Sequence, residues 1–323
     1  MTTGNSFSNR SLVSDTSAKE ASMSNAVKQK PSFMDRVEEW LPKIVMSPTI
    51  VITTVFIYGF VIWTGVLSFT KSRILPVYDF VGFEQYVKLF ANDRWMLALK
   101  NLAIFGFLFI FICLAVGLIL AILLDQRIRA EGFIRTIYLY PMALSFIVTG
   151  TVWKWLLNPT VGLEKFFHSI GWESFEFGWL VDPEMAIYTI VIAGVWQSSG
   201  FVMALFLAGL RGVDSSIIKA AQIDGAGLVK IYTRIIIPSL RPVFFSAFIM
   251  LAHIAIKAFD LVMALTGGGP GNSTDVPAIF MYQFSFTRSQ MGMGAASAMV
   301  MLFGIIAILI PFLYSELRAT KNV

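Results

Sequence analysis

The sequence predicts an all-α membrane protein with six transmembrane helices. Of its 323 residues, 56% are hydrophobic and only 14% are charged, and the mean hydropathy is +0.72. A soluble domain carries more charge than this. Several apolar stretches also reach the roughly 20 residues that a helix needs to cross the hydrocarbon core of a bilayer. The excess of apolar side chains is therefore expected to face lipid.

The first part of the chain differs in composition from the rest. Residues 1–32 are rich in Ser, Asn, Thr and Ala and show no periodicity, which is typical of a disordered tail. The stretch 33–47 is apolar on one helical face, with Phe33, Val37 and Trp40 aligned. Two interpretations stay open for it: an amphipathic helix on the membrane surface, or simply the start of the first membrane helix.

Six membrane spans are predicted within residues 48–315, followed by a short C-terminus, 316–323. The expected spans are 48–69, 101–124, 137–157, 185–210, 243–265 and 292–314. An even number of spans puts both ends of the chain on one side of the membrane. Each span is long enough to cross the hydrocarbon core as a helix.

The distribution of basic residues predicts the orientation. The termini and the even-numbered connections hold 16 of the 25 Lys and Arg residues, and the odd-numbered connections hold 7. Cytoplasmic connections are enriched in Lys and Arg, so both termini are predicted to be cytoplasmic. The net charge of +5 is explained in this way, and nucleic acid is not expected as a partner. The connection 71–100 departs from the rule with five basic residues on the external side.

The connection 211–242 is long and partly apolar, and its pattern predicts a short helix. Asp214 or Ser215 is suited to cap the N-terminus of this helix. Gly225 and Gly227 can end it through a left-handed turn. The helix is too short to span a membrane and is predicted to lie across the cytoplasmic end of the helix bundle.

The same connection offers a surface to a partner. The residues expected together on one helical face are Ile217, Ile218, Ala221 and Gln222. The small residues that permit close approach are Ala220, Ala221, Gly225 and Ala226. A second short helix is expected over 228–236, with Pro238 after it, because proline suits a first helical turn but not an interior. The alternative is a well-packed cytoplasmic loop without a partner.

This segment resembles the motif shared by membrane subunits of binding-protein-dependent ABC importers. The motif has Glu-Ala-Ala, a Gly four residues after the second Ala, and then Ile-x-Leu-Pro. The matching residues are Lys219, Ala220, Ala221, Gly225, Ile235, Ile237 and Pro238. Lys219 stands where Glu is usual, and Ile237 replaces Leu. The resemblance implies a coupling helix that docks in a groove of an ATPase subunit. The residues it assigns to this role are Ile217, Ile218, Lys219, Ala220, Ala221, Asp224, Gly225, Ala226 and Pro238.

Further motifs resemble the maltose-type carbohydrate importers. They are found at 80–86, 158–162, 259–261 and 265–271, and the runs 137–159 and 278–286 resemble the glucose/mannose branch. The resemblance implies a type I importer permease in a bacterial inner membrane. It also implies a second homologous permease, two ATPase subunits, an external solute-binding protein and a sugar substrate. ATP and Mg would bind to the ATPase, so no cofactor, metal or catalytic residue is expected in this chain.

Ionisable residues within the fifth predicted span are candidates for the substrate pathway. His253, Lys257 and Asp260 are spaced i, i+4 and i+7, so they can share one helical face. Charges in hydrocarbon are costly, and such residues usually face a bundle interior or a wet cavity. One interpretation is a structural ion pair between Lys257 and Asp260, and another is a face that lines the pathway of a sugar. Both can hold together.

Polar residues near the middle of the fourth predicted span form a second group of candidates. Gln197 and Ser198, with Trp196 or Phe201, can supply the planar polar groups and the aromatic face that bind a sugar. Tyr140 and Ser145 in the third span are weaker candidates of the same kind. The alternative for this group is helix packing through small and polar residues.

Other activities are less well supported by the sequence. The glycine-rich stretch 267–274 lacks the Lys of a phosphate-binding loop, so ATP hydrolysis by this chain alone is not expected. An ion-coupled secondary transporter would leave the connection 211–242 unexplained. A membrane scaffold or sensor would leave the polar residues in the spans unexplained. A permease subunit of an ATP-driven sugar importer accounts for both features.

Overall fold

The structure is a computed structural model that describes residues 33–126 and 129–321. Its elements are α2 (Phe33–Leu67), α3 (Glu84–Phe90), α4 (Asp93–Asp125), α5 (Glu131–Leu139), η1 (Tyr140–Ala143), α6 (Phe146–Leu156), α7 (Leu163–Ser169), η2 (Gly178–Leu180), α8 (Ala186–Arg211), α9 (Ser215–Ile223), α10 (Leu228–Ile231), η3 (Tyr232–Ile236), α11 (Ile237–Ser239), α12 (Arg241–Ile256), α13 (Phe259–Leu265), α14 (Pro277–Tyr282), η4 (Gln283–Thr287) and α15 (Met291–Lys321). Here η1 and η2 are 3-10 helices, whereas η3 and η4 are π-helices. The described residues contain no strand, only one isolated bridge between Thr70 and Phe80. The all-α fold is therefore confirmed.

The chain divides into two compact units, residues 1–62 and 63–323. The described part of the first unit, residues 33–62, lies within α2, and the last residues of this helix belong to the second unit. This helix runs without a break through the stretch 33–47, and its window that is apolar enough to cross a membrane is Val45–Leu67. Residues 1–32, predicted to be a disordered tail, lie outside the described residues.

Hydropathy and length identify the helices that can cross a membrane. Within the part of the chain that the structure describes, four helices qualify by themselves: the second part of α2, α4, α8 and the first part of α15. Two bent pairs, Glu131–Ala143 with Phe146–Leu156 and Leu228–Ser239 with Arg241–Ile256, bring the number up to six if each pair is one span.

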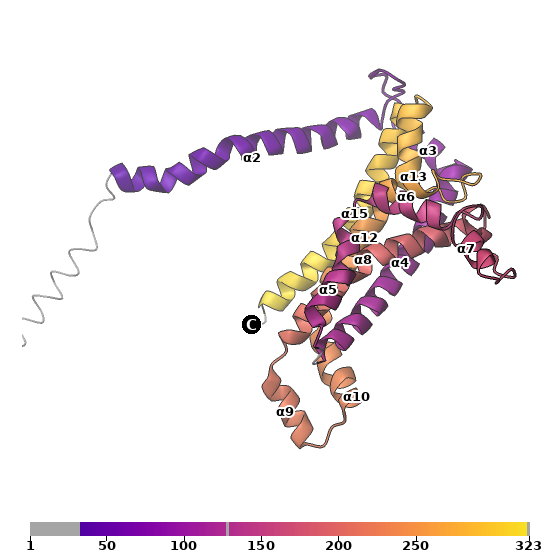
Figure 1. Ribbon diagram of the computed structural model, residues 1–323. Helices are drawn as coiled ribbons and strands as arrows, with labels where there is room; N and C mark the ends of the chain where they lie inside the picture. Colours follow the sequence, from indigo (N-terminus) through magenta and orange to yellow (C-terminus); the bar gives the residue numbers. More distant parts are fainter. Residues whose placement is uncertain (1–32, 127–128, 322–323) are drawn as a thin grey trace, which may run out of the picture. The chain divides into compact units, whose positions relative to one another are not determined.

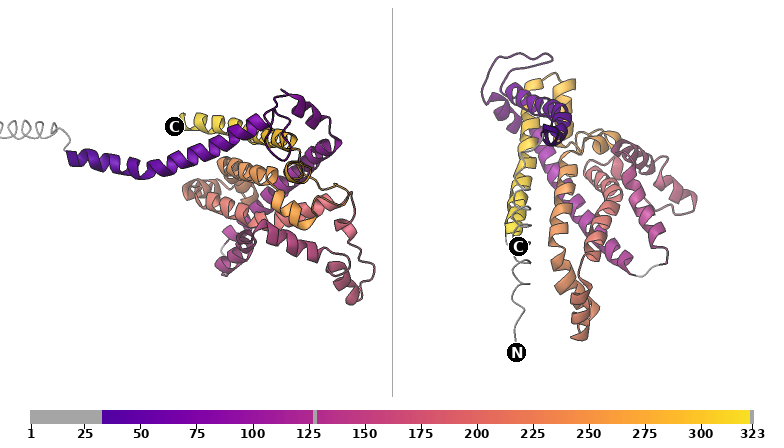
Figure 2. Two further views of the ribbon diagram at one scale, coloured as in Figure 1. Left: turned by 90° about the horizontal axis from the view of Figure 1, so that it is seen from above. Right: turned by 90° about the vertical axis from the view of Figure 1, so that its left-hand side faces the viewer.

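The second unit is built around α4 and α8, which pack along each other, while α12 packs against α4 (Figure 1, Figure 2). Their contact is a cluster of buried apolar side chains that includes Phe105, Phe109, Phe206 and Leu251. Helix α4 begins at Asp93, several residues before the predicted span, because the Asn92 side chain accepts hydrogen bonds from the backbone NH groups of Arg94 and Trp95.

The third predicted span is bent rather than straight. The two helical pieces meet at 100°, because Leu144 and Ser145 have extended backbones. Ser145 then caps α6, since its hydroxyl accepts a hydrogen bond from the NH of Val148. Gly200 of α8 lies against the first piece, where a Cβ would be only 1.8 Å from the carbonyl oxygen of Tyr138. A glycine at this place thus allows the two backbones to touch.

The fifth predicted span, 243–265, is also broken. Helix α12 ends at Ile256, and α13 begins at Phe259. The link consists of Lys257 and Ala258, and the backbone of Ala258 is outside the helical region, at φ −69° and ψ 54°. One continuous helix over 243–265 was therefore a wrong prediction.

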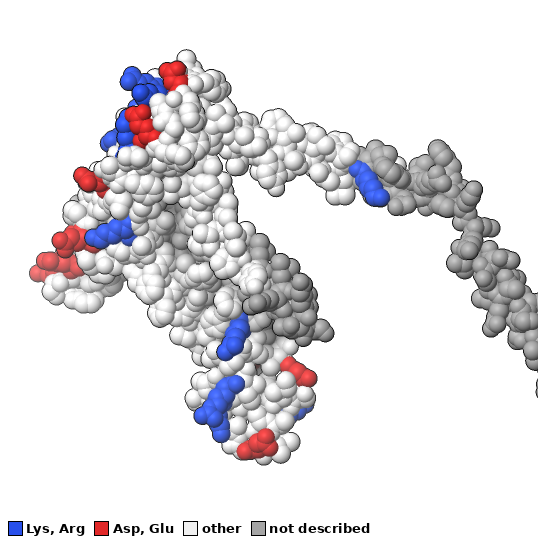
Figure 3. Space-filling view, turned by 180° about the vertical axis from the view of Figure 1, so that it is seen from behind, with Lys and Arg blue, Asp and Glu red and all other residues white. Residues whose placement is uncertain are grey.

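The two ends of the second unit carry different features. Helices α9 and α10 form a hairpin-like projection at one end, whereas α3 and α13 lie at the other (Figure 1). Lys and Arg side chains gather together with acidic ones at this second end, at the top of the view in Figure 3.

Candidate functional site

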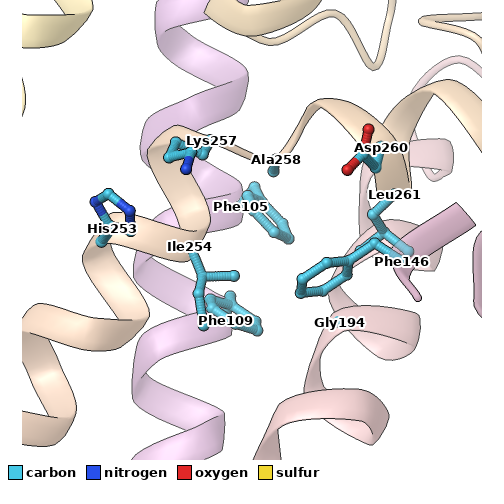
Figure 4. A pocket seen from close by; sticks show the side chains of 10 residues that line it. All are labelled: Phe105, Phe109, Phe146, Gly194, His253, Ile254, Lys257, Ala258, Asp260 and Leu261. Carbon is cyan, nitrogen blue, oxygen red and sulfur yellow. The ribbon is translucent and has the colours of Figure 1, made fainter. Parts of the chain in front are cut away.

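A pocket lies where the broken fifth span approaches α4, α6 and α8. Its volume is about 170 Å³. The residues that line it are Phe105, Phe109, Phe146, Gly194, His253, Ile254, Lys257, Ala258, Asp260 and Leu261 (Figure 4). Lys257 stands at the end of α12 and Asp260 in the first turn of α13, so the break in the span brings both charged groups to the pocket wall.

A second pocket of about 290 Å³ adjoins the first. The residues that line it are Met142, Leu144, Ser145, Phe146, Gln197, Ser198, Phe201, Ile254 and Asp260. Phe146, Ile254 and Asp260 belong to both linings. The two pockets therefore form one polar and aromatic region at the breaks of two helical segments.

Most of the candidate pathway residues meet in this region. Those that line one or both pockets are Ser145, Gln197, Ser198, Phe201, His253, Lys257 and Asp260. Tyr140 and Trp196 line neither pocket. The ring of Trp196 packs edge-on against Trp153, with 5.9 Å between the centroids. Phe201 is therefore the aromatic candidate that the structure places beside Gln197.

Gln197 is the most enclosed polar group of the region. Its side chain is 3% exposed, and its amide nitrogen donates a 2.8 Å hydrogen bond to the carbonyl oxygen of Leu144, at the bend before α6. Its carbonyl oxygen Oε1 is buried without a hydrogen-bond partner. An unpaired buried acceptor costs free energy, so this oxygen favours a ligand that brings a donor such as a hydroxyl.

His253, Lys257 and Asp260 do not form the helical face that their spacing predicted. Lys257 lies in the link that follows α12, whereas Asp260 lies in the first turn of α13 (Figure 4). Among the ion pairs of the described residues, none joins Lys257 to Asp260. The structure does not support the interpretation as a structural ion pair, because the break removes the i, i+3 geometry that this pair required.

These three ionisable side chains are exposed on the second unit. A charged group that faced hydrocarbon there would cost several kcal/mol, about 2.5–3.5 on insertion scales. They must therefore face water or a polar surface in the membrane. Non-helical backbone at membrane depth is tolerated under the same condition, where it is buried in protein or lines a wet cavity.

The connection 211–242 folds largely as its sequence predicts. Asp214 caps α9, accepting a 2.8 Å hydrogen bond from the NH of Ser216, and this hydrogen bond lowers the pKa of Asp214. Gly225 ends the helix with φ +78°. This left-handed backbone conformation is unfavourable for residues that have a Cβ atom. Gly227 has φ −68° and instead precedes α10, so only one of the two glycines makes the left-handed turn.

The two faces of α9 have different environments. Ile218 and Ala221 are partly buried and pack against the core of the second unit, as does Ala226. Ile217 and Ile223 point outward and are 51% and 87% exposed. The expected common face of Ile217, Ile218, Ala221 and Gln222 was therefore wrong, because the core of the chain itself takes Ile218 and Ala221.

We call the exposed residues Ile217, Ala220 and Ile223 the α9 outer face. Lys219 is exposed beside it. The next exposed apolar side chains, Leu228 and Val229 of α10, extend the apolar surface at this end. Ile223 was not predicted as part of this surface, although it is spaced i, i+3 from Ala220, which is itself spaced i, i+3 from Ile217.

A buried ionic network was also missed from the sequence. The Arg94 guanidinium of α4 pairs with the Asp275 carboxylate and donates a 2.6 Å hydrogen bond to Gln283. Asn101 donates 2.9 Å hydrogen bonds to the carbonyl oxygens of Ser273 and Asp275. These contacts hold the connection between α13 and α14, next to the broken span. Burial raises the pKa of Asp275, and Arg94 acts against this rise.

The donor groups do not gather in the manner of a metal site. Among residues 33–126 and 129–321, no group of three or more His, Cys, Asp or Glu side chains could hold a metal ion. The chemistry that the region offers is hydrogen bonding, charge and aromatic contact.

Similarity to known proteins agrees with this architecture. The family model described as "Binding-protein-dependent transport system inner membrane component" matches residues 113–318. The chain is 40% identical to a probable ABC transporter permease protein of Pyrococcus horikoshii, over 87% of this chain and 98% of the relative. It is 34% identical to the xylose/arabinose import permease protein XacH of Haloferax volcanii, over 83% and 85% of the two chains.

A solved structure shares the fold. It is that of a bacterial alginate ABC transporter in complex with an alginate pentasaccharide-bound periplasmic protein. The TM-score is 0.76 at 20% identity, and the match covers 90% of this chain and 99% of that chain. The molecule is thus an ABC importer permease by class. The chain belongs to the family of inner membrane components of binding-protein-dependent transport systems.

Proposed function

We propose that this chain forms, with a second permease, the pathway by which a sugar crosses the membrane in an ATP-driven importer. The observation that carries the proposal is the convergence of seven polar, charged or aromatic candidates on two adjoining pockets at the helix breaks. Hydroxyl groups of a sugar would satisfy the unpaired Oε1 of Gln197, and Phe201 would offer an aromatic face. Such a site needs no bond-making residue.

The substrate class follows from the same chemistry. Two related importer components are named for carbohydrates, xylose or arabinose in one case and alginate in the other. The pocket residues are suited to neutral hydroxyls through Gln197 and Ser198, and Lys257 and Asp260 can each bind a hydroxyl through a charge-assisted hydrogen bond. A glucose- or mannose-like sugar or an oligosaccharide is the proposed substrate.

The α9 outer face is proposed to couple this pathway to two ATPase subunits, which would bind ATP and Mg. A helix that exposes Ile217 and Ile223 at the end of a membrane bundle is suited to a groove in a partner. Docking there would transmit closure of the ATPase pair to the helices, in a system with two stable arrangements. Family membership leaves no role for an ion-coupled carrier or for a scaffold.

Family membership supports the proposals for the remaining partners and the location. An external solute-binding protein would deliver the sugar at the end of the bundle opposite α9. The protein is proposed to lie in a cytoplasmic membrane with several spans. The relatives include archaeal proteins, so the similarity does not restrict the chain to bacteria.

The pathway proposal is tested by Gln197→Leu. The change removes the unpaired acceptor and is expected to weaken sugar binding by about 1–3 kcal/mol, roughly 5- to 150-fold. Sugar uptake should be measured per assembled complex in reconstituted vesicles, because the variant also loses the hydrogen bond to Leu144. Thr189→Val is the matched control, since it deletes a buried hydroxyl of α8 that bonds only within its own helix. Equal uptake per complex in wild type and Gln197→Leu would reduce Gln197 to a packing residue.

The orientation is tested by fusions at the two termini. The excess of Lys and Arg in the termini and even-numbered connections predicts that Met1 and Val323 are both cytoplasmic. A reporter that is active only in the cytoplasm should therefore work at either end, and one that needs export should fail at both. A signal from outside at either end would rule out six spans with this orientation.

A further inference from the structure

We propose that a basic pocket at the end of the bundle opposite α9 binds the phosphate of an anionic phospholipid head group. The pocket has a volume of about 1140 Å³. It lies between the segment that follows α2, helix α3, and the residues just before and at the start of α15. The pathway residues described above are not part of its lining.

The lining carries more positive than negative charge. Lys71, Arg73, Lys88 and Arg288 line the pocket together with a single carboxylate, that of Glu84. Glu84 is shared by two amino groups, at 2.6 Å from Lys88 and 3.9 Å from Lys71. The hydrogen bond from Lys88 lowers the pKa of Glu84, and the negative charge of this carboxylate is therefore paired within the pocket.

Neither arginine forms a close ion pair, although Arg288 is near enough to Asp275 to act against the rise in the pKa of that carboxyl. None of the ion pairs between described residues includes Arg73 or Arg288. The Arg288 guanidinium lies over the ring of Phe284, 4.7 Å from its centroid, which leaves its edge open to an anion. An arginine fork is well matched to the oxygens of a phosphate group.

The position of these cations next to membrane spans indicates that the phosphate belongs to a lipid. Helix α2 ends at Leu67, four residues before Lys71, and α15 begins at Met291, three residues after Arg288. Both helices contain segments apolar enough to cross a membrane. The cations therefore follow or precede the ends of two spans, where long basic side chains can reach the phosphates of lipid head groups.

Apolar side chains in the same pocket also fit a lipid. Ile74 and Leu75 line the pocket and are 69% and 73% exposed. On α3, Val87 and Phe90 point outward, while Leu89 is buried. A free phosphate ion would satisfy the cations but would leave these apolar side chains in water. A phospholipid supplies a phosphate and hydrocarbon together.

The lipid site gives a role to three of the five basic residues in the connection 71–100, because Lys71, Arg73 and Lys88 line the pocket. The odd-numbered connections hold only 7 of the Lys and Arg residues, and five of these lie within 71–100. Arg94, a fourth basic residue of this connection, pairs instead with Asp275.

The test uses the full-length chain, purified with its co-purifying subunits, and native mass spectrometry during titration with phosphatidylglycerol or phosphatidylcholine. The pocket variant is Arg73→Gln with Arg288→Gln. The control is Lys154→Gln with Lys165→Gln, which removes the same charge from positions outside the pocket lining. The wild type is expected to retain one phosphatidylglycerol more tightly than phosphatidylcholine. The pocket variant should bind it about 25-fold more weakly, about fivefold for each cation, and the control within about twofold of wild type.

Three results would overturn the proposal. An equal loss in the control variant would mean that total charge, not the pocket, retains the lipid. Release of phosphatidylglycerol by millimolar inorganic phosphate would assign the pocket to a free anion. Unchanged lipid retention in the pocket variant, with weaker stimulation of ATP hydrolysis by the external solute-binding protein, would assign it to an acidic protein surface. Sugar uptake is not a readout, so the pathway proposal stands or falls separately.

Discussion

Ile223→Asp is expected to abolish most sugar uptake while the chain stays inserted in the membrane. Ile223 is 87% exposed at the last turn of α9, and it makes no contribution to the buried core of the chain. If the α9 outer face docks in an ATPase groove, the new carboxylate must lose its water there without a partner. Such central apolar contacts cost 2 kcal/mol or more when lost, about 30-fold in affinity. The measurements are retention of the ATPase by the tagged permease in detergent, followed by uptake and ATP hydrolysis in vesicles.

Two variants of α9 serve as contrasts. Ile223→Leu keeps an apolar side chain and should retain the ATPase. Ala221→Asp acts on the inner face, where Ala221 packs against the core, so it should lower the thermal stability of the isolated chain as well as the uptake. Ile223→Asp should leave that stability unchanged. If the Ile223→Asp variant retained the ATPase normally and took up sugar normally, α9 would not be the coupling helix.

Lys219 provides a further contrast because it stands where the family motif has Glu. Its side chain is exposed. Lys219→Glu should be nearly silent if the charge meets only solvent. An acidic groove would instead make the reversal weaken ATPase retention in a salt-dependent way.

The sequence could predict the parts of the fold that depend on local patterns. The apolar stretches, the cap at Asp214 and the left-handed Gly225 are local properties, and the structure has all of them. The breaks at Leu144 and Ala258 could not be seen in this way. Both residues are apolar, so an average of hydropathy does not detect the breaks. The helical pieces on either side of them pack on different neighbours, η1 on α8, α12 on α4 and α13 on α6.

The candidate site was predictable in its residue types but not in its geometry. Polar residues in apolar spans identified Gln197 and Asp260, which prove to lie in one pocket lining. Trp196 was grouped with them because it is adjacent in the sequence. Its ring instead packs against that of Trp153 and lies outside the pocket linings. The inner and outer faces of α9 could not be distinguished, since a nine-residue helix with apolar residues around most of its circumference fits the core in several rotations.

The ionic network around Asp275 was hidden from the sequence for a different reason. Arg94 and Asp275 are 181 positions apart, and only the packing of α4 against α14 brings them together. Each residue alone looks like an ordinary charge in an external connection. The sequence gives only a weak indication that Asp275 is buried. This residue is followed by the apolar Val276 and Pro277, and no local pattern explains an acidic side chain at this place.

Arg94→Ala is expected to destabilise the protein strongly. The Asp275 side chain is fully buried and that of Arg94 is 12% exposed, so the variant leaves a buried carboxylate without its cation. Removing one partner of a buried pair typically costs about 3–5 kcal/mol. The apparent melting temperature of the purified protein should therefore fall well below that of wild type at pH 7.5. Lys100→Ala, at an exposed position of the same helix, should change it little.

The loss in Arg94→Ala should depend on pH with a defined sign. Burial raises the pKa of Asp275, and without Arg94 the pKa should rise further. An acid whose pKa is higher in the folded state than in the unfolded one binds its proton more tightly when folded. The folded state is then favoured at low pH, and this advantage is lost as the pH rises from the ordinary value of about 3.9 through the raised one. The deficit of Arg94→Ala relative to wild type should accordingly shrink as the pH is lowered from 7.5 toward 5.

Asp275→Asn in the Arg94→Ala background completes the test. The amide carries no charge, so the double variant should recover much of the lost melting temperature and should lose the pH dependence of the single variant. The connection between α13 and α14 keeps the two hydrogen bonds that Asn101 donates to backbone carbonyl oxygens, which the substitutions do not touch. A double variant no more stable than Arg94→Ala would mean that the arginine acts through Gln283 and packing, because removal of the buried charge would then have relieved nothing.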